Sequence, residues 1–156
     1  MSYSDSPLSG ETRNNLVLLG GDQVNDLVAV TRQTGTISNL EYQVVADLIT
    51  LHDRFSGTTY SAQRENGEVT VDYGRMIRSI SPYNPERTLV MISGIYGFGT
   101  WGGVRLLEDK YFLRSCEALE VFDFECLFEV RIVRGEPEIV RPMAIRPLNA
   151  ARPTAA

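Results

Sequence analysis

Residues 87–114 have the sequence Arg87-Thr-Leu-Val-Met-Ile-Ser-Gly-Ile-Tyr-Gly-Phe-Gly-Thr-Trp-Gly-Gly-Val-Arg-Leu-Leu-Glu-Asp-Lys-Tyr-Phe-Leu-Arg114. Within them, an apolar run from Thr88 to Ser93 leads into a glycine-rich loop and then into an amphipathic segment. This order predicts a buried strand, a tight loop and a helix with Val104, Leu107 and Tyr111 on one face. In α/β proteins such a loop lies where ligands bind, because the helix N-terminus offers backbone N–H groups without intrahelical partners.

A weaker copy of this pattern lies near the N-terminus. Residues 15–20, Asn-Leu-Val-Leu-Leu-Gly, form a short apolar run that suits a buried parallel strand, and Gly21 and Asp22 end it. A helix is predicted to follow, with Asp22 as its N-cap and Asn25 in its first turn. Because the carboxyl ends of parallel strands share one edge of a sheet, the two glycine loops are predicted to frame one crevice.

The rest of the chain predicts strands joined by short turns. Residues 36–50 fit either a helix or a strand, and the preferred interpretation is a short helix or turn followed by a strand over residues 47–52. Asn66-Gly67 signals a hairpin turn, and the strand from Val69 to Ile80 is predicted to be interrupted at Tyr73-Gly74. Further strands are predicted over residues 58–60, 121–133 and 138–148, with a proline-fixed loop at residues 81–85.

The composition is that of a globular protein. Of the 156 residues 43% are hydrophobic, and the formal net charge of −5 argues against nucleic acid as a partner, since phosphate binding needs a basic surface. We find neither a secretory signal nor an apolar run that could cross a bilayer, so we expect a soluble, cytoplasmic protein that does not bind membranes. Cys116 and Cys126 fit no zinc motif and are predicted to be reduced and buried.

These patterns favour one α/β domain over residues 15–148, with flexible tails over residues 1–14 and 149–156. Its mixed sheet would combine parallel core strands with antiparallel hairpins.

The loop at residues 94–103 contains five glycines in ten positions. They could provide positive φ angles, room for a ligand beside the backbone, or close packing of the helix on the sheet. Neither the dinucleotide fingerprint nor a Walker loop is present, because the glycine order is reversed and no Gly-Lys-Ser/Thr occurs. Thr100 is a candidate N-cap, and Tyr96, Phe98 and Trp101 offer aromatic surface for a ring. A small-molecule site is preferred over a glycine-rich turn without a ligand.

Ligand-binding and catalytic candidates follow from these two loops and their neighbours. The predicted ligand-binding residues are Gly20, Gly21, Asn25, Asn84, Gly94, Tyr96, Gly97, Gly99, Thr100 and Trp101. Asp22 and Asp72 are catalytic candidates only if the protein is an enzyme, because acid–base chemistry needs a positioned carboxylate. No metal site and no cofactor are predicted.

Other polar residues are predicted to have structural roles. His52, the one histidine, is expected at the surface or in a hydrogen bond. A run of acidic residues is predicted to form a solvated face, which arginines of the last strands would balance. The acidic residues are Glu117, Glu120, Asp123, Glu125 and Glu129, and the arginines are Arg131, Arg134, Arg141 and Arg146.

Four motifs together resemble a poorly characterised Rossmann-like domain family of prokaryotes. They are the loop Gly20-Gly-Asp-Gln-Val-Asn25, Asp72-Tyr-Gly74, Pro82-Tyr-Asn-Pro85 and Ser93-Gly-Ile-Tyr-Gly-Phe-Gly-Thr-Trp101. The first loop is also similar to the Gly-Gly-Pro-x-x-Asn start of the C-terminal domain of archaeal surface-layer proteins, although Asp22 stands where that pattern has proline. The resemblance implies a three-layer α/β fold and a sensor or regulatory role, without an established chemistry.

Three functions therefore remain as hypotheses. The first is a sensor or regulatory module that binds a small, nucleotide-like molecule at residues 94–101. The second is a hydrolase or glycosyl-transferring enzyme that acts on such a molecule, with Asp22 or Asp72 as its carboxylate. The third is a self-assembling structural module whose aromatic loops and edge strands pack against copies of itself, and a homo-oligomer is expected.

Overall fold

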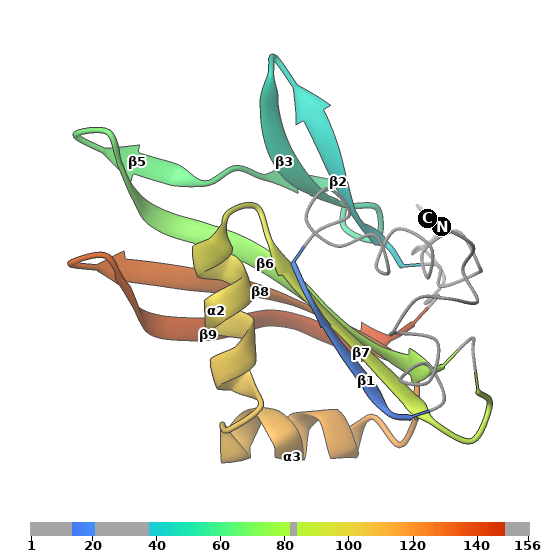
Figure 1. Cartoon of the computed structure of the whole chain (residues 1–156). Helices are drawn as coiled ribbons and strands as arrows, with labels where there is room; N and C mark the ends of the chain where they lie inside the picture. The colour runs from blue at the N-terminus through green and yellow to red at the C-terminus, as the bar shows by residue number, and fades with distance from the viewer. Residues whose placement is uncertain (1–13, 21–37, 82–83, 149–156) are drawn as a thin grey trace, which may run out of the picture.

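The computed structural model describes residues 14–20, 38–81 and 84–148. Of these residues 55% lie in strands and 16% in two helices, as Figure 1 shows. The elements are β1 (Leu16–Leu19), β2 (Leu40–Val45), β3 (Leu48–Asp53), β4 (Thr58–Tyr60), β5 (Gln63–Glu65), β6 (Glu68–Ile80), β7 (Thr88–Gly94), α2 (Gly97–Leu106), α3 (Lys110–Ala118), β8 (Phe124–Val133) and β9 (Glu136–Pro147).

The main sheet has six strands in the order β1-β7-β6-β8-β9, with β5 paired to β6. β1 and β7 are parallel, and every other pair in this sheet is antiparallel. A second sheet, β2-β3-β4, is antiparallel throughout. β2 and β3 form a hairpin whose far end stands away from the main sheet (Figure 1).

The two faces of the main sheet are covered differently. Alternate residues point to opposite faces of a strand. On one face Ile92, Phe128 and their neighbours pack with Leu106 of α2 and Phe112 of α3. On the other face Tyr73, Leu127 and their neighbours pack with buried residues of the second sheet, and the members of that cluster are Leu40, Leu51, Val71, Tyr73 and Leu127.

The predicted Rossmann-like, three-layer α/β fold is wrong. The described residues are mostly strand, and the layer opposite the two helices is a small antiparallel sheet. A parallel sheet needs long crossover connections, whereas the tight turns of this chain make neighbouring strands antiparallel. One such turn is Asn66-Gly67, where both residues have positive φ, as the Asn-Gly signal predicts. The main sheet is mixed, as predicted, because its β1–β7 pair is parallel.

Individual elements also differ from the sequence prediction. Residues 40–45, predicted as helix or turn, form β2. β6 continues through Gly74 without interruption. Glycine is required there by packing, because a Cβ at residue 74 would lie 2.4 Å from the carbonyl oxygen of Ser93 and 2.5 Å from Cζ of Phe128. The predicted single helix is two helices, since the Asp109 side chain accepts hydrogen bonds from the N–H groups of Tyr111 and Phe112 and caps α3. The strands predicted at residues 88–93 and 58–60 are confirmed.

Several predictions fall on residues outside the described ranges. They include Gly21, Asp22 and Asn25, the helix predicted after them, and the two tails apart from Asn14. Among the helices of the described ranges, none has both the length and the apolar character that a bilayer span requires.

Candidate functional site

The carboxyl ends of β1 and β7 lie side by side. The two strands are parallel, with Leu19 opposite Ile92, and the N–H of Gly20 donates to the carbonyl oxygen of Ile92 at 2.9 Å. Gly20 and Gly94 therefore end neighbouring strands at the same edge of the sheet, as predicted. The rest of the first loop, Gly21 and Asp22, lies outside the described residues, so the crevice between the two loops stays a prediction. α2 begins three residues after Gly94, at Gly97.

The N-terminus of α2 is capped by a carboxylate from another strand. The N-cap residue, Tyr96, makes no side-chain cap, and Asp72 of β6 takes that role. Its carboxylate oxygens accept hydrogen bonds from the N–H groups of Tyr96 at 3.0 Å and Gly99 at 2.7 Å. These are the two N–H groups that a capping box satisfies from within a helix. Here one buried side chain satisfies both from outside.

Burial raises the pKa of the Asp72 carboxyl to about 6, although hydrogen bonds from Gly99, Tyr73 and Tyr96 lower it. A carboxyl with such a pKa has the right proton affinity for acid–base catalysis near neutral pH. However, Asp72 is fully buried, and both of its oxygens accept hydrogen bonds from backbone N–H groups. This geometry suits a helix cap, and the catalytic role of Asp72 stays a prediction.

We expect Asp72→Asn to lower the free energy of unfolding by about 1–3 kcal/mol, because the amide NH₂ would face a backbone N–H and leave it unsatisfied. The folded-state pKa of about 6 lies above the ordinary carboxyl value of 3.8. The stability contributed by protonation of Asp72 is therefore present below pH 4 and is lost as the pH rises through 6. Urea unfolding at pH 4 and pH 7 should show a larger deficit at pH 4. An equal deficit at both pH values would contradict the assigned pKa.

Most glycines of the 94–103 loop are required by packing within the chain. A Cβ at Gly94 would lie 2.4 Å from Cα of Gly99, so these two residues touch. A Cβ at Gly102 would lie 2.4 Å from Cγ2 of Val130, and one at Gly103 would lie 2.3 Å from Cγ2 of Ile92 and 2.7 Å from Cζ of Phe128. Gly97 differs, because the space around its Cβ position is open. Of the five glycines, Gly97 is thus the one beside which a ligand has room.

Two aromatic rings at this end of α2 each pair with an arginine. Nη2 of Arg64 donates to Oη of Tyr96 at 2.6 Å, and the guanidinium carbon lies 5.0 Å from the centre of the Tyr96 ring. Trp101 is 42% exposed, and the Arg105 guanidinium lies 5.4 Å from its ring centre. Arg64 was not among the binding residues predicted from the sequence. The Asn-Gly turn, which folds β5 back along β6, could have indicated that Arg64 lies near this loop.

The structure brings most of the predicted site residues together. The residues at the carboxyl ends of β1 and β7 and in the first half of α2 are Gly20, Gly94, Tyr96, Gly97, Gly99, Thr100 and Trp101. Asn84 is separate, because it lies in the β6–β7 connection at the opposite end of β7, where its Oδ1 accepts a hydrogen bond from the N–H of Glu86. A cavity of about 410 Å³ lies elsewhere, between α3 and β9. Its lining residues are Asp109, Tyr111, Phe112, Ser115, Pro142, Met143, Ala144 and Ile145.

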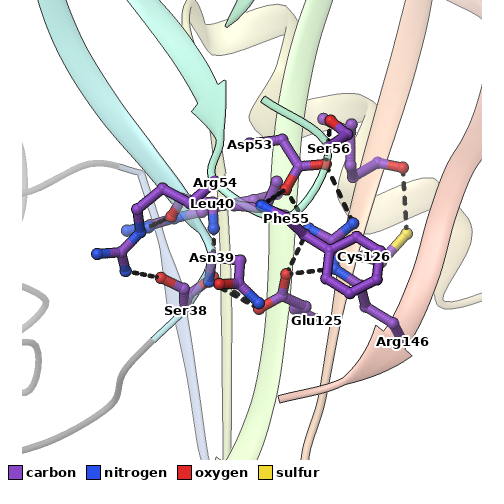
Figure 2. A network of polar contacts seen from close by, with 12 residues as sticks. Ser38, Asn39, Leu40, Asp53, Arg54, Phe55, Ser56, Glu125, Cys126 and Arg146 are labelled. Atoms are coloured by element: carbon purple, nitrogen blue, oxygen red, sulfur yellow. Dashed lines mark hydrogen bonds and ion pairs between the residues drawn. The ribbon is translucent and has the colours of Figure 1, made fainter. Parts of the chain in front are cut away.

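A second polar cluster lies between the two sheets (Figure 2). Nη2 of Arg146 lies 2.5 Å from an oxygen of Asp53 and 2.7 Å from an oxygen of Glu125. The other oxygen of Glu125 accepts hydrogen bonds from Ser38 Oγ at 3.1 Å and from the N–H of Asn39 at 2.9 Å. Asp53, Ser38 and Asn39 belong to the second sheet or the segment before it, so this cluster fastens that sheet to β8 and β9.

The charges in this cluster are mutually compensated. Burial alone would raise the pKa of Asp53, but hydrogen bonds from Arg146, Ser56 and the N–H of Phe55 outweigh it and hold the pKa below its usual value. Glu125 is fully buried, and Glu129 is 9% exposed and pairs with Arg131 and Arg141. The predicted solvated acidic face is therefore wrong for these two glutamates.

The predictions for Arg141 and Arg146, for His52 and for the two cysteines are confirmed. Arg141 and Arg146 do balance acidic residues of the run. Nδ1 of His52 lies 2.8 Å from Oγ1 of Thr59 in an exposed hydrogen bond. Both cysteines are free and buried. In the part of the chain that the structure describes, no three histidine, cysteine or acidic side chains gather as a metal site would require.

No protein-family model matches the chain, and no curated protein or solved structure shows significant similarity to it. Membership of a prokaryotic Rossmann-like family therefore stays a prediction. The three-layer α/β fold that this resemblance implies is wrong, as described above.

Proposed function

We propose that the protein is a sensor or regulatory module that binds a small molecule at the carboxyl end of β1 and β7. The observation that carries this proposal is the surface at the start of α2, where open space beside Gly97 adjoins the Tyr96 ring and the exposed Arg64 guanidinium. Binding sites commonly lie at such strand ends, because the loops there are positioned by the sheet behind them.

The chemistry of this surface suits a ligand with a planar ring and an acidic group. The rings of Tyr96 and Trp101 offer faces for stacking, and Arg64 offers planar donors for a phosphate or carboxylate. The N-terminus of α2 contributes less to anion binding than a helix N-terminus usually does, because the N–H groups of Tyr96 and Gly99 already donate hydrogen bonds to the Asp72 carboxylate. Recognition of the anion therefore falls chiefly to Arg64, and a nucleotide-like molecule has both required groups.

An enzyme remains the second candidate, but the described geometry favours it less. Of its two proposed carboxylates, Asp72 is buried under the loop that it caps, and Asp22 lies outside the described residues. A binding role needs no such group. The proposal includes a cytoplasmic location and no nucleic-acid partner, in keeping with the net charge of −5.

Tryptophan fluorescence can test the binding proposal, because Trp101 is the one tryptophan of the chain. Titration of the purified protein with purine and pyrimidine nucleotides is expected to change the emission of Trp101 in a saturable manner for at least one of them. Arg64→Ala and Tyr96→Ala should each weaken that binding about tenfold, equivalent to roughly 1.4 kcal/mol. Native mass spectrometry should show the same ligand bound.

Arg114→Ala is the matched control, since Arg114 is an exposed arginine on α3, away from the start of α2. Its affinity should equal that of the wild type. Binding that survives both Arg64→Ala and Tyr96→Ala would exclude this surface as the site. A wild-type protein that binds none of the nucleotides by either method would contradict a nucleotide-like ligand.

A further inference from the structure

The cavity between α3 and β9 runs along the open edge of the main sheet. Four consecutive residues of β9 line it, from Pro142 to Ile145, and α3 forms the other wall. Successive side chains of a strand point to opposite faces, so four in a row share one cavity where it follows the backbone rather than one face. In the described part of the sheet, β9 is an edge strand with β8 as its one neighbour. The volume of about 410 Å³ is within the range of ligand pockets.

Ile145 presents both of its backbone hydrogen-bonding groups to this edge. The N–H of Leu148 donates to the carbonyl oxygen of Asp123 at 3.0 Å, which makes these two residues a hydrogen-bonded pair of the ladder. Such pairs alternate along antiparallel strands, so Ile145 and its partner Cys126, three positions further along, share no backbone hydrogen bonds. The N–H and C=O of Ile145 therefore point away from β8. Among the described residues, no hydrogen bond from outside the ladder reaches either group.

A β-bulge and two prolines limit how much of this edge a further strand can use. Ala144 and Pro142 pair with successive residues of β8, so Met143 between them is an extra residue. Bulges often lie next to binding sites, where they redirect side chains. Pro142 and Pro147 have no N–H to donate. A further strand can therefore pair only over a short segment centred on Ile145.

The polar side chains of the cavity suit a cation. Asp109 is the one charged residue of its lining. The Oδ1 atom of Asp109 accepts the N–H groups that it caps on α3, and no donor of the described residues reaches its Oδ2 atom. Tyr111, which is 80% exposed, offers a ring face for an ammonium or guanidinium group. Lys110 and Arg114, the two cations of α3, do not line the cavity, so a cationic ligand meets a carboxylate there and no like charge.

We propose that this cavity binds a short extended peptide with a basic side chain, which adds as a strand to β9 at Ile145. The peptide residue opposite Ile145 donates its N–H to the Ile145 carbonyl oxygen and accepts the Ile145 N–H. Directly opposite residues point their side chains to the same face of a sheet. The Ile145 side chain packs on the core cluster that contains Phe112 of α3, so the side chain opposite it points toward α3. A lysine at that position meets Asp109 and Tyr111.

A basic peptide uses more of this cavity than other ligands do. A small amine pairs with Asp109 but leaves the backbone groups of Ile145 without partners, and an acidic peptide faces the Asp109 carboxylate. The cavity is distinct from the ligand surface of Tyr96 and Arg64, because those residues lie at the start of α2 and on β5. The proposal therefore adds a peptide partner to the small-molecule ligand proposed above.

Titration of the isotope-labelled full chain with blocked tripeptides, followed by nuclear magnetic resonance, tests the proposal. Acetyl-Val-Lys-Val-amide should shift the backbone amide signals of Ile145, Tyr111 and Ser115 in a saturable manner. Acetyl-Val-Glu-Val-amide should leave them unchanged, because its carboxylate faces Asp109. A lysine peptide whose lysine N–H is methylated cannot donate to Ile145 and should bind about tenfold more weakly.

Asp109→Asn separates the negative charge from the helix cap. Asparagine caps helices as well as aspartate does, so the variant keeps the fold and loses the charge. Its affinity for the lysine peptide should fall about tenfold, to that of acetyl-Val-Met-Val-amide, whose central side chain is neutral. Glu108→Gln is the matched control, because Glu108 is an exposed carboxylate next to Asp109 that does not line the cavity. Its affinity should equal that of the wild type.

The proposal is overturned if the lysine peptide causes no saturable shift, or if the shifts lie away from β9 and α3. It is also overturned if n-butylamine, which has the cation without a backbone, binds as tightly as the lysine peptide. Equal affinity of the methylated peptide would exclude pairing at Ile145, and an unchanged affinity of Asp109→Asn would exclude recognition of the cation there. Arg64→Ala should leave peptide binding unchanged, so this site and the nucleotide-like site succeed or fail separately.

Discussion

Replacing Arg146 by methionine is expected to lower the free energy of unfolding by about 3–5 kcal/mol, the cost of leaving buried charges without their partner. Arg146 is the cation between Asp53 and Glu125, which are 2% and 0% exposed. Methionine keeps much of the volume and removes every donor, so both carboxylates lose their cation. Chemical denaturation at pH 7, followed by circular dichroism, gives the free energy directly.

The pH dependence separates this loss of charge from a simple packing defect. In the wild type the lowered pKa of Asp53 means that its stabilisation is present above the usual pKa of 3.8 and disappears as the pH falls through the folded-state value. In the variant the unpaired buried carboxylate of Asp53 should bind a proton more readily, so the deficit should shrink between pH 7 and about 5. Arg131→Met, at a side chain 62% exposed, is the control and should change stability by less than about 0.5 kcal/mol.

Gly103→Ala is expected to destabilise the protein by about 1–3 kcal/mol, although alanine normally stabilises a helix relative to glycine. Gly103 is buried in α2, and a Cβ there would lie 2.3 Å from Cγ2 of Ile92 and 2.7 Å from Cζ of Phe128. Neither neighbour can withdraw, since both lie in the fully buried core beneath the helix. α2 would have to move off the sheet.

Gly97→Ala in the same helix is expected to have the opposite effect on stability. The space around its Cβ position is open, so the change should stabilise the protein by up to about 1 kcal/mol. Thermal unfolding of the two variants beside the wild type should shift the midpoint in opposite directions. Shifts of the same sign would show that the packing of α2 on β7 and β8 is not what requires glycine at residue 103.

The local patterns of the sequence predicted strands and turns well. The apolar run before Gly94, the Asn-Gly turn and the run near Asn15 each gave a strand or turn where the structure has one. The shared edge of Gly20 and Gly94 also followed, since it needs only that the two strands be parallel neighbours. The prediction failed for the layer on the far face of the sheet. The apolar side chains of residues 40–45 have a spacing that fits a helix as well as a strand, and only the pairing of these residues with β3 decides between the two.

The buried charges were beyond the reach of local patterns. An acidic residue in an alternating strand is usually solvated, and nothing near Glu125 in the sequence shows that Arg146 lies opposite it. The register between β8 and β9 creates that contact, and the second sheet then buries it. Asp72 was singled out as a carboxylate near the loop, but its role as a cap requires knowledge of which strand lies beneath α2.

The β1–β7 pair also bears on the order in which the chain folds. Leu16 pairs with Leu89 across almost half of the sequence, whereas β6 and β7, like β8 and β9, follow each other directly. Closing the long loop costs more chain entropy than closing the hairpins, and β1 gains only one neighbouring strand in return. The antiparallel strands β7, β6, β8 and β9 can therefore assemble first, with β1 docking late. The edge at which we place the ligand would then be completed in the last step, so a bound ligand would act on the part of the sheet that opens most readily.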